Sequence, residues 1–247
     1  GFVDSIAGGG GLISFPAYML AGVPVHVTMG TTKLSSFPGS VVAAARFAKR
    51  GLIRWKLAVP CAAASILGAA LGANLAGHKF KHRAGVVVQP ADNMRLIQSL
   101  MIVVLPVVAF YVMRNKEMGR KEGESELPWG KMLAAGLFAS LLIGMYNGFY
   151  GPGTGTFLIL VFTGVVKMEL KEAAGVSKFI NLAADISALG TFYANGKVDY
   201  ILGITAALFC MAGSYIGSGL VVGNGQKIVR PVVMTVLVLL FIKILMG

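Results

Sequence analysis

The feature that most restricts how this chain can fold is a stretch of 35 consecutive residues, 132–166, without Asp, Glu, Lys or Arg. As one straight helix it would be about 52 Å long, whereas the hydrocarbon core of a membrane is only about 30 Å thick. The stretch must therefore be interrupted. We predict the interruption in the sequence GPGTG at 151–155, because proline removes a backbone donor and glycine permits non-helical dihedral angles.

A second interruption of the same kind opens the chain, where four glycines at 8–11 precede the short apolar segment 12–23. Each of the two regions is predicted to form a helix, a glycine-rich break and a half-helix. The chain begins at Gly1 without a methionine and enters this region at once. We therefore expect that an N-terminal piece is missing from this numbering.

Composition places the whole chain in a membrane. Hydrophobic residues make up 56% of the 247 residues and charged residues only 13%, about half the charged share of a soluble domain. Too little polar chain remains to cover a water-facing surface, which excludes soluble enzymes and nucleic-acid-binding modules. Apolar windows of the right length predict further spans. These windows are residues 27–48, 57–77, 96–113, 173–194, 200–226 and the tail 231–246.

The two halves of the chain repeat each other at a fixed offset of 145 residues, which joins Lys33 to Lys178 and Gly8 to Gly153. Lysine is rare inside apolar helices, so the lysine match is the strongest sign of a duplication. We predict an all-α integral membrane protein of two homologous repeats, each with about five membrane segments including one half-helix. The first repeat is residues 1–114, the connecting loop 115–128 and the second repeat 129–247.

Loop charge distinguishes inverted from parallel repeats. If each half-helix counts as a crossing, the second repeat is inverted, and 14 of the 22 Lys and Arg residues fall on one side against 6 on the other. If helix and half-helix form one crossing, the division is 12 against 8. The inverted arrangement follows the positive-inside rule better and is the one we predict.

The lysines are candidates for function, because a lysine in the middle of a membrane helix costs about 2.5–3.5 kcal/mol to insert. Hydroxyl and amide side chains accompany each of them at helical spacing. Each half-helix also begins with unpaired N–H groups and a positive dipole end, which suit an anion. We predict a central anion-binding site. Its predicted residues are Lys33, Lys178, Thr32, Ser36, Ser177, Asn181, Gly8, Gly10, Gly153, Thr154 and Gly155.

Structural alternatives stay open. The lysines could pair with acids such as Asp4 and Asp185, which would then serve charge balance or coupling; Asp185 follows Lys178 by seven residues and so lies on a similar face. The glycines at 8–11 could serve close helix packing instead. No His, Cys and carboxylate cluster has metal-ligand spacing, and no Walker A, HExxH or GxSxG motif is present. We therefore predict neither a cofactor nor an enzyme.

Both halves resemble a known family. The segments GGGGLISFP at 8–16 and GTTKL at 30–34, and their counterparts GFYGPGTG at 148–155 and AGVSKFIN at 174–181, are similar to the signatures of the sulfite exporter TauE/SafE family, also called the toluene sulfonate uptake permease family. The resemblance implies a multi-pass permease in the lipid bilayer of the bacterial inner membrane. Its expected substrate is a small anion, sulfite or an organosulfonate, typically exported. An anion channel and proton-coupled uptake of a related organic acid are the alternatives, and a homodimer stays open.

Overall fold

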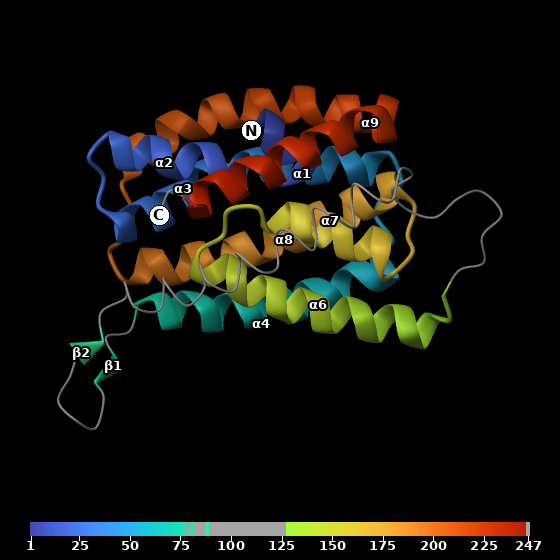
Figure 1. Cartoon of the computed structure of the whole chain (residues 1–247), viewed down its shortest axis with the longest axis horizontal. Helices are drawn as coiled ribbons and strands as arrows, with labels where there is room; N and C mark the ends of the chain where they lie inside the picture. The colour runs from blue at the N-terminus through green and yellow to red at the C-terminus, as the bar shows by residue number, and fades with distance from the viewer. Residues whose placement is uncertain (78–79, 82–86, 89–126, 246–247) are drawn as a thin grey trace.

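The computed structural model describes residues 1–77, 80–81, 87–88 and 127–245 (Figure 1). The expected span 96–113 and residues 115–126 of the expected connecting loop lie outside them. The described helices are α1 (Phe2–Ala7), α2 (Gly11–Leu20), α3 (Val25–Lys49), α4 (Trp55–Gly77), α6 (Trp129–Phe149), α7 (Thr154–Gly164), α8 (Leu170–Ala194) and α9 (Tyr200–Leu245). Two-residue strands β1 (Phe80–Lys81) and β2 (Val87–Val88) pair antiparallel; the rest of the described regular structure is helical, as predicted.

The long apolar windows form helices of membrane-spanning length. Three described segments are long and apolar enough to cross a membrane: Trp55–Leu75, Trp129–Phe149 and Tyr200–Gly225. They leave large apolar side chains exposed, such as Leu67 and Phe209, which is the surface expected of helices that face lipid. At Asn224 the backbone of α9 is non-helical, and the chain turns back there along the bundle (Figure 1).

The two lysine-bearing helices, α3 and α8, run antiparallel at the centre of the molecule. Each contains 25 residues. Near the start of α3, Gly30 lies against Phe192 at the end of α8, and near the start of α8, Gly175 lies against Leu52, just after the end of α3. The two helices therefore run in opposite directions, as Figure 1 also shows.

Glycines at a spacing of four residues let neighbouring helices approach closely. In the pair α4 and α6, Gly72 faces the backbone of Met145. In the pair α9 and α1, Gly217 faces the backbone of Phe2. Such small-residue contacts replace the hydrophobic driving force that lipid cannot supply between helices. Each broken helix, α1 or α6, is thus held by a helix from the other half of the chain.

The half-helix α7 lies inside the protein core. Almost all of its side chains are buried, and they join a cluster with residues from α1, α3, α4, α8 and α9. The half-helix α2 is more open, with Ile13 and Leu20 exposed. The helix break that precedes α7 therefore lies deep in the bundle rather than at its surface.

Candidate functional site

Both predicted helix breaks are present. Residues 8–10 separate α1 from α2, and residues 150–153 separate α6 from α7. Gly8 has a φ of 70°, while Gly151 and Gly153 have φ values of 92° and 84°. Glycine reaches this left-handed region without the strain that a side chain would impose. The long apolar stretches are thus divided as the sequence predicted.

The two breaks touch each other at the centre of the protein. The backbone of Gly8 packs directly on the backbone of Gly155, so that a methyl group on either glycine would overlap the other residue. Beside this contact the Thr156 hydroxyl donates to the carbonyl oxygen of Ala7. The glycines therefore serve both of the purposes that the sequence left open, because they break the helices and let them pack closely.

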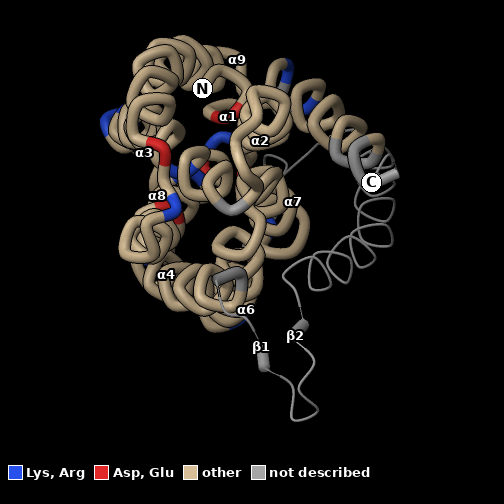
Figure 2. The backbone as a smooth tube through the Cα atoms, turned by 90° about the vertical axis from the view of Figure 1, so that its left-hand side faces the viewer, with Lys and Arg blue, Asp and Glu red and all other residues tan. Residues whose placement is uncertain are grey.

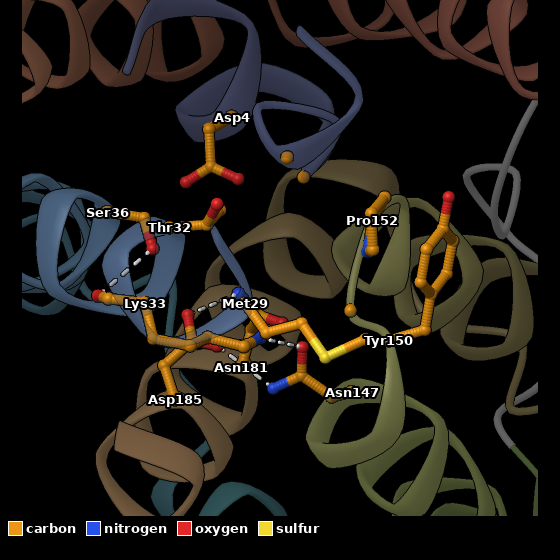
Figure 3. A pocket seen from close by; sticks show the side chains of 13 residues that line it. Asp4, Met29, Thr32, Lys33, Ser36, Asn147, Tyr150, Pro152, Asn181 and Asp185 are labelled. Atoms are coloured by element: carbon orange, nitrogen blue, oxygen red, sulfur yellow. Dashed lines mark hydrogen bonds and ion pairs between the residues drawn. The ribbon is translucent and has the colours of Figure 1, made fainter. Parts of the chain in front are cut away.

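Lys33, from α3, lies in a network that joins both halves of the chain (Figure 3). Its ammonium nitrogen is 2.7 Å from Oδ1 of Asp185 in α8 and 2.5 Å from Oδ1 of Asn147 in α6. Asn147 in turn donates from Nδ2 to Asp185 Oδ1 at 2.9 Å. The two contacts use two of the three N–H donors of the ammonium, which leaves one for a ligand.

Lys178, from α8, pairs with Asp4 of α1. Its ammonium donates to Asp4 Oδ2 and lies 3.4 Å from the Asp4 carbonyl oxygen. The sequence had placed Asp185 on the same face as Lys178, but Asp185 binds Lys33 instead. Positions seven residues apart on a helix are separated by about 10.5 Å along its axis, whereas antiparallel packing brings Lys33 directly alongside Asp185.

The predicted cationic centre is therefore balanced by acids. The four side chains of the two ion pairs are at most 9% exposed, and the two ammonium groups face an equal number of carboxylates. Figure 2 shows basic and acidic segments near the centre of the ring of helices, in addition to those on the outer parts of the helices. Buried charges persist only when they are paired and hydrogen-bonded, so the pairing explains how two lysines are tolerated here.

A small cavity lies where the two breaks meet the ion pair of Lys33 (Figure 3). Its volume of about 30 Å³ is room for about two water molecules. It is lined by Asp4, Gly8, Gly11, Met29, Thr32, Lys33, Ser36, Asn147, Tyr150, Gly151, Pro152, Asn181 and Asp185. Both helix breaks thus border one cavity.

A model of the family described as "Sulfite exporter TauE/SafE" matches residues 1–244. The chain belongs to this family. It is accordingly a membrane transporter, and the resemblance seen in the sequence is confirmed.

Named relatives of this TauE/SafE chain are also described as transporters. It is 34% identical over 245 residues to a "Probable membrane transporter protein ORF9" of a Sinorhizobium species, covering 99% of this chain and 88% of that protein. It is 31% identical over 245 residues to "Probable membrane transporter protein YfcA" of Escherichia coli K12, covering 99% and 85%. A "Probable membrane transporter protein" of Haemophilus influenzae is 26% identical over 236 residues, covering 94% and 85%. No solved structure matches the chain.

Seven of the predicted site residues line the cavity of this TauE/SafE transporter. They are Asp4, Gly8, Thr32, Lys33, Ser36, Asn181 and Asp185. The lining does not include the other six: Lys178, Ser177, Gly10, Gly153, Thr154 and Gly155. In this structure, therefore, only the first of the two lysines reaches the cavity.

Thr154 illustrates why a predicted residue can lie behind the site. Its hydroxyl is 3.0 Å from Asn147 Oδ1 and 2.5 Å from the carbonyl oxygen of Gly151. A hydroxyl has one proton to donate, and the two acceptors lie in the last turn of α6 and in the second helix break. Thr154 thus supports Asn147 rather than the cavity itself.

Asn147 is the functional candidate that the sequence analysis missed. It carries an amide inside the uncharged stretch and stands four residues before Gly151, just as Asp4 stands four residues before Gly8. That spacing relative to each break was the available signal. The fixed offset of 145 residues hides it, because a shift of two residues is needed to align Asn147 with Asp4.

Several buried polar atoms near the lysines have no hydrogen-bond partner among the described residues. They include Thr32 Oγ1 and Ser177 Oγ, which precede Lys33 and Lys178 at equivalent positions, and Asn181 Oδ1. Buried polar groups in folded proteins are almost always paired. Thr32 and Asn181 both line the cavity, so each has capacity to bond to a ligand there.

The described residues contain no group of three or more His, Cys, Asp or Glu side chains that could hold a metal ion.

Proposed function

We propose that this transporter carries a small sulfur oxyanion, sulfite or an organosulfonate, through the cavity at Lys33. The observation that supports this most strongly is the buried ammonium of Lys33, which lines a cavity bordered by both helix breaks. The third N–H of that ammonium and the hydroxyl of Thr32 supply hydrogen-bond donors. The family description names sulfite as the exported substrate, and sulfite and sulfonates share the tripodal oxygens that such donors recognise.

We propose further that the two halves are inverted repeats that expose the site alternately. Equal lengths of α3 and α8 and their antiparallel course support this. So does the reciprocity of the polar contacts: Lys33 binds Asn147 in the broken helix of the second half, and Lys178 binds Asp4 in that of the first. In the opposite-facing state, Lys178 with Ser177 would take the place of Lys33 with Thr32.

The distribution of basic residues supports one orientation. Arg54, after α3, bonds to Glu172 at the start of α8 at 2.8 Å, and Lys171 packs against Gly225 beside the kink in α9. These basic segments lie at one end of the bundle, while Lys197 follows the opposite end of α8. By the positive-inside rule, the end of the bundle that carries Arg54 and Lys171 faces the cytoplasm when the protein lies in a bacterial inner membrane. An anion that moves alone is driven outward by about 2.3 kcal/mol per charge per 100 mV, which favours export.

Reconstituted flux tests this proposal. Proteoliposomes are loaded with sulfite, sulfate, thiosulfate, sulfoacetate or taurine, and efflux is followed for wild type, for Lys33→Met and for Lys49→Met. We expect saturable efflux of sulfite or sulfoacetate, a loss of at least tenfold in Lys33→Met, and wild-type rates in Lys49→Met, because Lys49 is exposed at the end of the same helix. Flux of none of these anions above protein-free liposomes would reject the proposal, and non-saturating flux with single-channel currents would favour a channel.

Proton-coupled movement of an organic acid through the same cavity is the second candidate. It is favoured by one specific observation, namely that two carboxylates, Asp4 and Asp185, line the cavity together with Lys33.

A further inference from the structure

The charges that line the cavity do not favour an anion as they stand. Among the described lining residues, Lys33 is the one cation, while Asp4 and Asp185 are acids. Lys178, which balances Asp4, does not line the cavity. An anion that enters therefore meets two carboxylates and one ammonium in a small buried space. Because like charges at short range repel strongly in a low-dielectric interior, positive charge must arrive with the anion.

Asp185 is better arranged than Asp4 to receive that charge. Asp4 is held by Lys178 behind the cavity. Asp185 instead holds Lys33, the cation that faces the ligand space, and Lys33 has a second acceptor in Asn147 at 2.5 Å. If Asp185 becomes neutral, the Lys33 ammonium stays anchored by Asn147. Its positive charge is then available to an anion.

The neighbouring amide of Asn181 can accommodate both protonation states of Asp185. Asn181 Nδ2 now donates to Asp185 Oδ2 at 3.2 Å, as suits a carboxylate acceptor. Asn181 Oδ1 is buried and has no partner among the described residues. A rotation of this amide by half a turn would present Oδ1 to a proton on Asp185 Oδ2. It would also direct Nδ2, a donor, away from Asp185.

We propose that Asp185 binds one proton with each transported anion and releases it with the anion on the other side. An O–H bond forms on Asp185, the contact between Asp185 Oδ1 and the Lys33 ammonium breaks, and an oxygen of the anion takes its place as acceptor. One negative and one positive charge enter together, so the net charge of the site is unchanged. On release the O–H bond breaks and the ion pair with Lys33 forms again.

The groups around Asp185 agree with this assignment. The titratable side chains that line the same cavity as Asp185 are Lys33 from α3, Asp4 from α1 and Tyr150, directly after α6. Lys178, on the same helix as Asp185, bonds to Asp4. The titratable residues of α4 are Lys56 and Cys61, near its start, and α7 has none. The described part of α9 before the kink contributes only Cys210 and the tyrosines 200 and 215. The other carboxylates of these elements have cations of their own, because Asp4 bonds to Lys178 and Glu172 pairs with Arg54.

This inference rests on the proposed function and alters its energetics. The loaded site of a monovalent anion carries no extra charge, so the membrane potential does not select the direction. Export then follows an excess of the anion inside the cell, and an acidic exterior opposes it.

The wild-type protein tests the coupling directly. The probe is methanesulfonate, whose sulfonate stays ionised throughout the pH range, so that any pH effect belongs to the protein rather than to the substrate. With the outside about one pH unit more acidic, coupling of one proton per anion supports about tenfold accumulation in the vesicles. A potassium diffusion potential set with valinomycin should leave the initial rate unchanged. No accumulation with the pH gradient, together with a rate that follows the potential, would overturn the coupling.

Two variants test whether Asp185 is the residue that binds the proton. Asp185→Asn, which resembles the neutral acid, should transport methanesulfonate without pH-driven accumulation and with a rate that now depends on the potential. Glu172→Gln is the matched control, because Glu172 is a carboxylate on the same helix that pairs with Arg54 outside the cavity; it should accumulate the probe as wild type does. Tenfold accumulation by Asp185→Asn would overturn the assignment to Asp185.

Different results would exclude proton coupling and anion transport. Saturable flux without proton coupling removes this inference and leaves the anion transporter. Absence of flux of every sulfonate and of sulfite in the wild type removes both.

Discussion

At the scale of single residues, the main feature of the candidate site is that each buried charge is compensated by an opposite charge. A lysine in a membrane helix is costly, and this protein contains two, each with a buried carboxylate at hydrogen-bonding distance. A buried ion pair contributes little net stability, but removal of one partner leaves an uncompensated charge. The residues proposed to bind the ligand are thus also the residues whose loss would most disturb the fold, and flux alone cannot separate the two roles.

A double substitution separates binding from stability at Lys33. Lys33→Met leaves the Asp185 carboxylate buried without its cation, and we expect a loss of about 3–5 kcal/mol in the free energy of unfolding together with a loss of flux. Lys33→Met combined with Asp185→Asn removes both charges, so most of the stability should return while the flux stays absent. Thermal unfolding in detergent and efflux from proteoliposomes are the measurements. Recovery of flux in the double variant would show that the ammonium of Lys33 is not needed for transport.

Lys178 provides a second prediction at this scale. The ammonium of Lys178 does not line the cavity in this structure. If this state alone binds the anion, Lys178→Met combined with Asp4→Asn should transport normally. If the two halves exchange roles during the cycle, the same double variant should lose at least tenfold in flux while keeping wild-type thermal stability. Normal flux in a stable double variant would argue against the alternating use of the two lysines.

At the scale of elements, glycine decides where the helices end and how closely they approach. Gly8 combines a left-handed φ of 70° with direct backbone contact to Gly155. Other glycines meet no such restriction: Gly190, inside α8, has no neighbouring atom within 4 Å of a side-chain position. The same residue type therefore has opposite consequences at positions that look alike in sequence.

Gly155→Ala should destabilise the protein by about 3 kcal/mol, because an added methyl group in a closely packed contact forces backbone movement. Gly190→Ala is the control and should be neutral or more stable by up to about 1 kcal/mol, since alanine is the better helix former. The midpoint of thermal unfolding measures both. Equal stability of the two variants would mean that the two helix breaks do not pack on each other.

At the scale of the whole molecule, the chain is built from halves that hold each other. The broken helix α1 packs against α9 and its Asp4 binds Lys178, while the broken helix α6 packs against α4 and its Asn147 binds Lys33. In each of these contacts, one partner belongs to the first half of the chain and the other to the second half. Movement of one half against the other therefore acts directly on both ion pairs, which is what alternating access through this site requires.

Labelling with a membrane-impermeant maleimide tests the proposed inversion. With Cys61 and Cys210 replaced, single cysteines are introduced at Arg50, at Lys171 and at Lys197. Arg50 directly follows α3 and Lys171 lies at the start of α8, so both are at the same end of the bundle. Lys197 follows α8 at the other end. We expect the first two to be labelled from the cytoplasmic side and the third from the opposite side. Labelling of Arg50→Cys and Lys197→Cys from the same side would contradict the inverted arrangement.

Much of this architecture could be predicted from sequence, because in a membrane the constraints are local. Hydrocarbon thickness limits the length of an apolar helix, and the positions of glycine and proline determine where a longer run must break. The helices α3, α4, α6, α7 and α8 were therefore predicted to within a few residues, as were both breaks and the two buried lysines.

The partners of those lysines were decided by tertiary structure alone. Sequence spacing put Asp185 on a similar helix face to Lys178 and left the pairing of the two lysines with Asp4 and Asp185 open. In the structure, antiparallel packing of α3 and α8 pairs Asp185 with Lys33, and Lys178 pairs with Asp4. The spacing of Asn147 before Gly151 was a signal in the sequence, but its contact with Asp185 follows only from the packing of α6 beside α8. Local constraints specify where helices begin and end, but which charges neutralise each other depends on how helices far apart in sequence are brought together, and that is fixed by packing across the whole bundle.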